Sequence, residues 1–204
     1  MKLRESSLGE DFQLNMIDKM GIYLSSYKVI QIVKKISKPI NCLDFGCGYN
    51  AHLLKSLSNY IEHGVGVDVN IDPNMKYKNL EFVRKKIDGN IDFSPNEQFN
   101  LVLCISVLEH LWNPQEVLNE FYRILQPGGT LLINVPTWRG KFFLELLAFK
   151  TNFSPSATIE MQDHKMYYNK EHLWPLLVRA GFNPMNIVLQ YYKFGLNLFC
   201  TVHK

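Results

Sequence analysis

Two carboxylates and a pair of glycines are the first residues in this chain whose types and spacing suggest chemistry. Asp44 lies in an apolar run that leads directly into Gly46 and Gly48, and Asp68 follows a second apolar run. Glycines spaced in this way let the backbone turn tightly and let a ligand approach without a Cβ in between. A helix that starts at about Asn50 would direct its first N–H groups toward that ligand. The spacing therefore predicts a turn that binds a small molecule.

Asp44 distinguishes between two classes of ligand. Gly46, Gly48 and Ala51 also satisfy the dinucleotide fingerprint G-x-G-x-x-G/A, and Asp68 follows where a ribose-binding acid would lie. A carboxylate just ahead of the turn would repel a pyrophosphate, but it suits a ligand that carries an ammonium or a sulfonium. S-adenosylmethionine carries both of these charges and a ribose. At this point the residues resemble the first motif, D-x-G-x-G, of the class I S-adenosylmethionine-dependent methyltransferases.

Two later segments extend this resemblance. Residues 107–111 look like the V-L-E-H-L segment of the small-molecule methyltransferases related to ubiquinone-pathway O-methylation enzymes, and residues 123–131 resemble the signature R-x-L-x-P-G-G. The resemblance implies an α/β fold with a Rossmann-like, mostly parallel sheet of seven strands. One strand near the C-terminus would be antiparallel, and helices would cover both faces of the sheet.

The same resemblance assigns the cofactor to a set of positions. The acidic loop at residues 87–93 offers a carboxylate to the adenine amino group, and we choose Asp88 although Asp92 competes for this role. Ile105 would contact the methionine part of the cofactor. S-adenosylmethionine is thus the expected cofactor and S-adenosylhomocysteine its product. The expected cofactor-binding residues are Asp44, Gly46, Cys47, Gly48, Asp68, Val69, Asp88 and Ile105.

Two histidines are the candidate catalytic residues. His110 directly follows the fourth predicted strand, and His164 lies beside Asp163 in a segment where the family pattern has faded. An unperturbed histidine titrates near neutral pH, so either one can remove a proton from a hydroxyl acceptor. For His110 the alternative is a structural role that ties the strand to the next helix. Both histidines are therefore candidates for a general base.

The elements that must position these residues alternate between strands and helices. Residues 10–37 are expected to be mostly helical, with a division at Gly21, and Asn113 is expected to cap a helix through a capping box. Asn169 should cap the last helix and Gly181 should end it. The expected strands cover residues 40–45, 64–69, 80–84, 99–106, 130–136, 185–191 and 194–203, and another helix covers residues 50–60.

Composition indicates one ordinary globular domain over residues 1–204. The chain has 47% hydrophobic residues and a net charge of +3, so its charge gives no reason to expect a nucleic-acid partner. Its four cysteines form no C-x-x-C pair and indicate reduced thiols, and no set of Cys and His at ligand spacing predicts a metal. The N-terminus lacks the apolar core of a signal peptide, which favours the cytoplasm.

Two parts of the domain are expected to lie outside the core. Residues 1–38 would form an N-terminal helical cap, and residues 137–168 would form a lid over the acceptor. The apolar helix at residues 141–149 gives the lid a rival interpretation, in which it contacts a membrane surface or a second copy of the chain.

The sequence therefore predicts an enzyme that moves a methyl group from S-adenosylmethionine to a small-molecule acceptor. A sugar, a lipid-linked compound or a specialised metabolite is the expected acceptor class, with O-methylation as the expected reaction. One alternative is a catalytically silent protein that binds S-adenosylmethionine in support of another enzyme. A nicotinamide-dependent oxidoreductase is the other, and Asp44 disfavours it.

Overall fold

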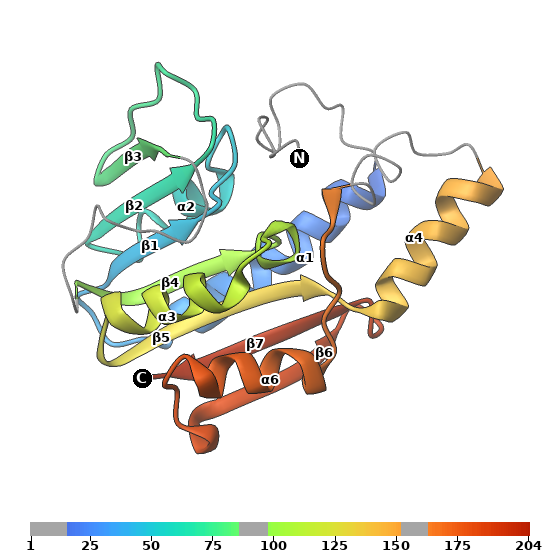
Figure 1. The fold of residues 1–204 in the computed structure, drawn as a ribbon. Helices are drawn as coiled ribbons and strands as arrows, with labels where there is room; N and C mark the ends of the chain where they lie inside the picture. The colour runs from blue at the N-terminus through green and yellow to red at the C-terminus, as the bar shows by residue number, and fades with distance from the viewer. Residues whose placement is uncertain (1–15, 86–97, 152–162) are drawn as a thin grey trace.

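A computed structural model describes residues 16–85, 98–151 and 163–204, in which strands and helices alternate (Figure 1). Apolar runs that are buried on both sides become the central strands, as in sheets covered by helices on each face. In chain order the elements are α1 (Met16–Val33), β1 (Asn41–Phe45), α2 (His52–Leu57), β2 (His63–Asp68), β3 (Leu80–Arg84), β4 (Phe99–Ile105), the 3₁₀ helix η1 (Leu108–His110), α3 (Pro114–Ile124), β5 (Leu125–Pro136), α4 (Trp138–Thr151), α6 (Lys170–Arg179), the 3₁₀ helix η2 (Pro184–Asn186), β6 (Ile187–Tyr192) and β7 (Asn197–His203).

The seven strands form one sheet in the order β3-β2-β1-β4-β5-β7-β6. β1 pairs in parallel with β2 on one side and with β4 on the other, while β7 runs antiparallel between β5 and β6. The predicted seven-stranded sheet with one antiparallel strand is therefore confirmed. Because β1, β2 and β4 are neighbours in parallel, their carboxyl ends meet at one edge of the sheet.

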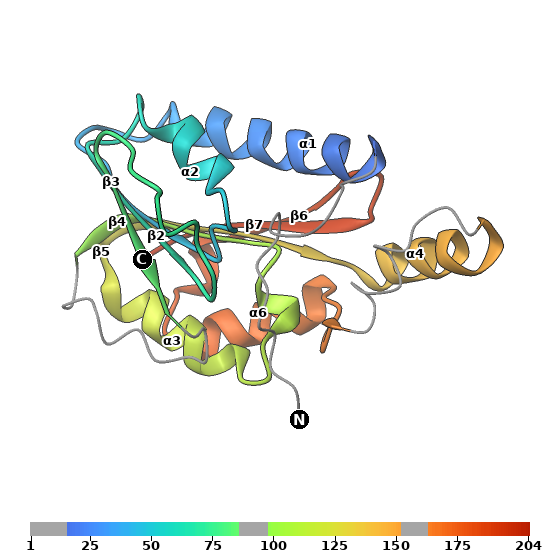
Figure 2. The same cartoon turned by 90° about the horizontal axis from the view of Figure 1, so that it is seen from above.

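Helices cover both faces of the sheet (Figure 2). α1 and α2 lie on one face, and α3 and α6 lie on the other. Side chains alternate between the two faces along each strand, so Cys42 belongs to the core under α1 and Leu43 to the core under α3. The central strands are thus buried on both sides, which fixes their register relative to the helices.

Helix ends show where local signals were right and where they were wrong. Asn169 begins α6 with a reciprocal capping box that involves His172, as the sequence predicted for an N-cap at this position. The side chain of Asn113 makes no such cap at α3, so that prediction was wrong; Pro114 at the first helical position remains the start signal. The predicted division at Gly21 was also wrong, because α1 runs through it as one helix.

The chain between β2 and β3 contains no helix, in agreement with the short link expected from the sequence. α4 projects from the end of β5, beyond the carboxyl edge of the sheet (Figure 2). Among the described residues, no helix is both long and apolar enough to cross a bilayer.

Candidate functional site

The predicted cofactor residues lie at the carboxyl edge of three neighbouring strands. Asp44 is opposite Gly66 in β2 and Leu103 in β4, Asp68 ends β2, and Ile105 ends β4. In an open α/β sheet, ligands bind outside the carboxyl ends of the strands. Topology thus gathers these positions at one edge, as the sequence predicted. Asp88 and its competitor Asp92 lie outside the described residues.

The glycine turn after β1 is fastened to β2 by its own backbone. The amides of Gly46 and Cys47 donate to the carbonyl of Val67, at 2.8 and 3.1 Å. Gly46 and Gly48 have φ angles of 82° and 76°, in the left-handed region that favours glycine. At Gly46 a Cβ would also come within 2.1 Å of Val107 Cγ2, so packing against the segment after β4 requires glycine there.

The helix after the turn starts later than expected and is short. α2 begins at His52, and Ala51 before it has a φ of 46°, also in the left-handed region. The Gly48 amide donates to Asp68, and the Ala51 amide donates to the carbonyl of Gly48. These N–H groups, which precede the helix, therefore hold the turn together. The expected start of the helix at about Asn50 was two residues too early.

Asp68 holds the turn and the end of β2 in place. Its Oδ2 accepts a hydrogen bond from the Gly48 amide at 2.7 Å, and its Oδ1 accepts from the Val69 amide at 2.8 Å. The residue is 7% exposed. Each carboxylate oxygen can accept more than one hydrogen bond, so the backbone bonds leave capacity for ribose hydroxyls. The carboxylate thus has its place and orientation set before any ligand arrives.

Asp44 is buried more deeply than Asp68. It is 2% exposed, and its Oδ2 has no hydrogen-bond partner among the described residues. Burial, followed by repulsion from Asp68, raises the pKa of Asp44 to about 7. A buried carboxylate with an unsatisfied oxygen is stabilised by a cationic partner. This orphaned oxygen fits the ammonium or sulfonium of S-adenosylmethionine.

The remaining cofactor positions supply apolar surface and shape. Cys47 is buried, and burial raises its pKa above the usual range, so its thiol stays neutral. Val69 and Ile105 are half-buried beside Asp68 and Ser106. Ser106 has a φ of 59° and its amide donates to the Asn134 carbonyl at 2.8 Å, which turns the chain away from β4.

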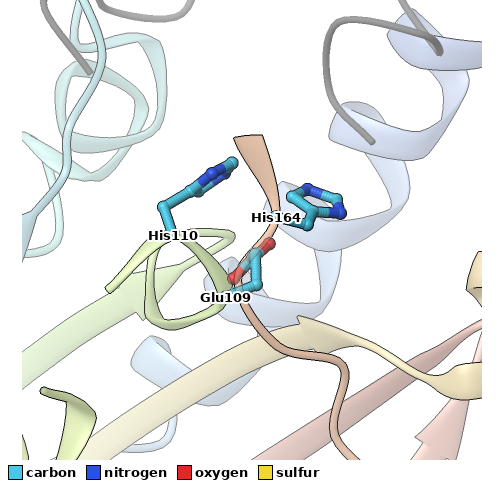
Figure 3. A group of neighbouring side chains, drawn as sticks. All are labelled: Glu109, His110 and His164. Carbon is cyan, nitrogen blue, oxygen red and sulfur yellow. The ribbon is translucent and has the colours of Figure 1, made fainter. Parts of the chain in front are cut away.

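His110 and His164 come together although they are far apart in the sequence. Their ring centroids are 4.8 Å apart, and the carboxylate of Glu109 lies below and between the two rings (Figure 3). His110 Nδ1 is 3.0 Å from Asp163 Oδ2, and His164 Nδ1 is 3.0 Å from the Tyr167 hydroxyl. Both rings are therefore oriented by partners from the segment that precedes α6.

That segment is bound to η1 by its main chain. The amides of Lys165 and Met166 both donate to the carbonyl of Glu109, at 2.7 and 3.2 Å, and the Tyr168 amide donates to the Pro136 carbonyl at 3.0 Å. Glu109 itself is 1% exposed. The sequence analysis did not foresee the roles of Asp163 and Tyr167. The Asp163-His164 pair beside an aromatic residue was the available signal.

α4 begins beside the histidine cluster. The Trp138 and Tyr167 rings are 5.6 Å apart, so the start of α4 contacts the segment that carries His164. Farther along α4, Phe142 is 68% exposed, and Phe143 and Leu146 are also exposed. Apolar side chains thus extend outward from the cluster, on an element that the sheet does not cover.

A seven-stranded Rossmann-like sheet with antiparallel β7, and with acids at the carboxyl ends of β1 and β2, is the arrangement expected of the S-adenosylmethionine-dependent methyltransferases. The family model described as "Methyltransferase domain" matches residues 23–186, and the chain belongs to this family. The resemblance to S-adenosylmethionine-dependent methyltransferases is thus confirmed, and the family implies S-adenosylmethionine as cofactor and S-adenosylhomocysteine as product.

Curated relatives agree with this assignment. A Mycolicibacterium smegmatis protein named for S-adenosylmethionine-dependent methyl transfer is 26% identical over 160 residues, which cover 76% of this chain and 56% of the relative. A ubiquinone biosynthesis O-methyltransferase of Klebsiella pneumoniae is 26% identical over 110 residues, or 50% of this chain and 45% of the relative. The chain spans about half the length of these curated relatives.

Solved structures share the fold. A methyltransferase solved together with its activator protein from Haloferax volcanii superposes with a TM-score of 0.67 at 14% identity, covering 90% of this chain and 92% of the other. An S-adenosylmethionine-dependent methyltransferase of Archaeoglobus fulgidus gives 0.65 at 17% identity, covering 89% and 94%. At such identities the likeness is one of fold.

Proposed function

We propose that this chain transfers the methyl group of S-adenosylmethionine to a hydroxyl of a small-molecule acceptor. The observation that carries the proposal is the arrangement of two kinds of group at one sheet edge. The acids Asp44 and Asp68 lie at the carboxyl ends of β1 and β2, and His110 follows β4 with His164 beside it. The acids suit the cofactor and the imidazoles suit the acceptor. A sugar, a lipid-linked compound or a specialised metabolite is the acceptor class proposed.

The cofactor is proposed to bind by charge and by shape. Asp44 would pair with the ammonium of the cofactor, Asp68 would accept from its ribose hydroxyls, and Gly46, Gly48 and Ile105 would line its path. Asp88 is proposed at the adenine. The cofactor supplies a methyl group that its sulfonium has already activated, so the protein's task is to align the acceptor oxygen with that carbon. Such positioning can lower the activation free energy by roughly 7–11 kcal/mol.

The cluster of Glu109, His110 and His164 is proposed to remove the proton from the hydroxyl of the acceptor. The two imidazoles are held by Asp163 and Tyr167 and stand beside a buried carboxylate. Groups held in this way keep the geometry that proton transfer needs. We assign the deprotonation to the cluster as a whole, with His110 and His164 as its catalytic residues.

The first test separates this proposal from a nicotinamide-dependent oxidoreductase. Calorimetry should show S-adenosylmethionine and S-adenosylhomocysteine binding to the chain and no heat with NAD, because Asp44 would repel a pyrophosphate. Affinity for NAD with none for S-adenosylhomocysteine would refute the proposal. A silent cofactor-binding partner would bind S-adenosylhomocysteine but would transfer no methyl group to any member of a panel of hydroxylated acceptors.

α4 is proposed to form part of a lid, made of residues 137–168, that covers the acceptor. Exchanging Phe142 and Phe143 for serine should leave S-adenosylhomocysteine affinity unchanged and raise the acceptor KM about 10-fold, because the acceptor loses apolar cover. Release of S-adenosylhomocysteine during turnover is the measurement. Phe194→Ser is the matched control, since Phe194 is 99% exposed on the turn between β6 and β7.

The same variant tests the rival roles of α4. Loss of binding to anionic vesicles with unchanged KM would assign residues 141–149 to a membrane surface. Loss of a dimer in solution would assign them to a second copy of the chain. A small-molecule acceptor, no nucleic-acid partner and a place in the cytoplasm complete the proposal. The acceptor rests on the family resemblance, the absence of a nucleic-acid partner on the small net charge, and the cytoplasm on the cysteines, which indicate reduced thiols.

A further inference from the structure

The cluster of Glu109, His110 and His164 has the ligand set of a divalent cation. One carboxylate oxygen and one nitrogen from each imidazole all lie within 4.8 Å of one another. Two imidazoles and a carboxylate, with further positions open, form a common catalytic ligand set for zinc and for other transition metals. This set could not be predicted from the sequence, because one of its histidines comes from η1 and the other from the segment before α6.

The spacing of these atoms suits a cation after small side-chain rotations. Zinc lies about 2.0–2.2 Å from nitrogen and oxygen ligands, so two ligands of a tetrahedral ion are about 3.4 Å apart. The ligand atoms of the cluster lie within 4.8 Å of one another, so they would have to approach one another to surround one ion. We expect rotation of the side chains about their own torsions to bring them together.

The neighbours of the cluster hold both imidazoles as metal ligands are usually held. His110 Nδ1 lies against the Asp163 carboxylate and His164 Nδ1 lies against the Tyr167 hydroxyl, each at 3.0 Å. Ligating histidines typically place one ring nitrogen on a carboxylate or another polar partner and offer the other to the metal. In the proposed site, Nε2 of each ring would be the ligand atom.

Burial gives a further reason for a cation here. Glu109 is 1% exposed, and the side chain of His110 is 12% exposed. A cation beside a carboxylate this deeply buried would interact with it strongly, because little water screens the two charges. The amides of Lys165 and Met166 donate to the Glu109 carbonyl and hold η1 at a fixed distance from the segment before α6. The ligands from these two parts of the chain are therefore held close together.

We propose that Glu109, His110 and His164 bind one divalent transition-metal cation, such as Zn²⁺, which joins η1 to the segment before α6. With the ion bound, His110 and His164 would act as its ligands and no longer as bases. Its open positions would take an acceptor oxygen and lower the pKa of that hydroxyl, and the released proton would pass to solvent. This catalytic use rests on the proposed function, whereas the binding itself does not.

Metal binding is tested on the whole chain after treatment with a chelator, with Zn²⁺ in calorimetry and Co²⁺ in visible absorption. We expect one ion per chain and a Co²⁺ spectrum of low coordination number. His164→Gln and His110→Gln should each weaken binding at least 10-fold, and Glu109→Gln should do the same. His63→Gln, at the exposed start of β2, is the matched control and should bind as the wild type does.

Several outcomes would overturn the proposal. These are the absence of stoichiometric binding, equal weakening by His63→Gln, and unchanged affinity in His164→Gln. Because Glu109 is buried, its variant is judged only if its circular dichroism and S-adenosylhomocysteine affinity match the wild type; His164, which is more exposed, supplies the test otherwise. A thiolate charge-transfer band with Co²⁺ would place the ion on cysteine and also overturn it.

Separate readouts keep the two proposals apart. If the chain binds S-adenosylhomocysteine and methylates an acceptor at full rate after chelation, the proposed catalytic use of the cation is refuted and the proposed function stands. If the chain binds Zn²⁺ through these residues but never binds S-adenosylhomocysteine, the cation site stands and the proposed function is refuted.

Discussion

Replacing Asp68 by alanine should weaken the binding of S-adenosylhomocysteine by about 1.5–3 kcal/mol, or roughly 10- to 150-fold. The charged acceptors for two ribose hydroxyls would be lost. The amides of Gly48 and Val69 would also lose the oxygens to which they donate at 2.7 and 2.8 Å. A lower melting temperature should therefore accompany the weaker affinity, and calorimetry with thermal denaturation measures both.

Asp68→Asn separates the two effects. It keeps one oxygen that can accept from a backbone amide, so it should recover part of the melting temperature without recovering the affinity that depends on the charge. Glu81→Gln, an exposed acid on β3, should change neither quantity. Wild-type affinity in Asp68→Ala would show that the ribose is held elsewhere.

The strands of this fold were predictable because their signals are local and strong. The apolar run at β4 and the short link before β3 both gave the right element, since a strand buried on both faces must be apolar throughout. The end of β2 at Asp68 was also well placed. The start of β5 was predicted at residue 130, whereas the strand begins at Leu125. Leu125 pairs with Phe99, and the register of the pairing shifts before Leu101 pairs with Thr130.

The site was predictable as far as the topology of neighbouring strands decides it. Asp44, Asp68 and Ile105 share an edge because β1, β2 and β4 are adjacent in parallel, which the family pattern implies. What brings His164 beside His110 is a set of main-chain bonds from Lys165 and Met166 to Glu109. Such contacts between distant segments leave no periodic trace in the sequence, so the cluster appears only in three dimensions.

Gly46 shows a similar limit of prediction from the sequence. The sequence suggested that its missing side chain makes room for a ligand, but the nearest obstacle to a Cβ is the Val107 side chain. The glycine is required by packing within the protein as well as by its φ of 82°. The type of residue was informative, while the physical reason for it depended on a neighbour that the motif does not include.

Replacing Asp44 by asparagine should stabilise the ligand-free protein above neutral pH while it removes most of the affinity for the cofactor. The pKa of Asp44 is about 7 in the folded chain, compared with about 3.9 in an unfolded one. The folded state therefore holds a proton that the unfolded state has released. This contribution to stability is complete below pH 4 or so and is lost as the pH rises through 7.

At pH 8 the folded wild type carries a buried charge without a cationic partner, at a cost of up to about 4 kcal/mol relative to low pH. Asp44→Asn cannot ionise, so its free energy of unfolding should exceed that of the wild type at pH 8, with a much smaller difference at pH 5. Denaturant unfolding at the two pH values measures this. Glu81→Gln should follow the wild type at both.

Cofactor binding should show the opposite preference. An ammonium beside Asp44 favours the carboxylate, so S-adenosylhomocysteine should bind more tightly as the pH rises from 6 to 8, with release of a proton that calorimetry in two buffers detects. Asp44→Asn should lose about 30-fold or more in affinity and also lose this pH dependence. If its affinity instead matches the wild type at every pH, Asp44 does not meet the ammonium, and its buried charge needs another explanation.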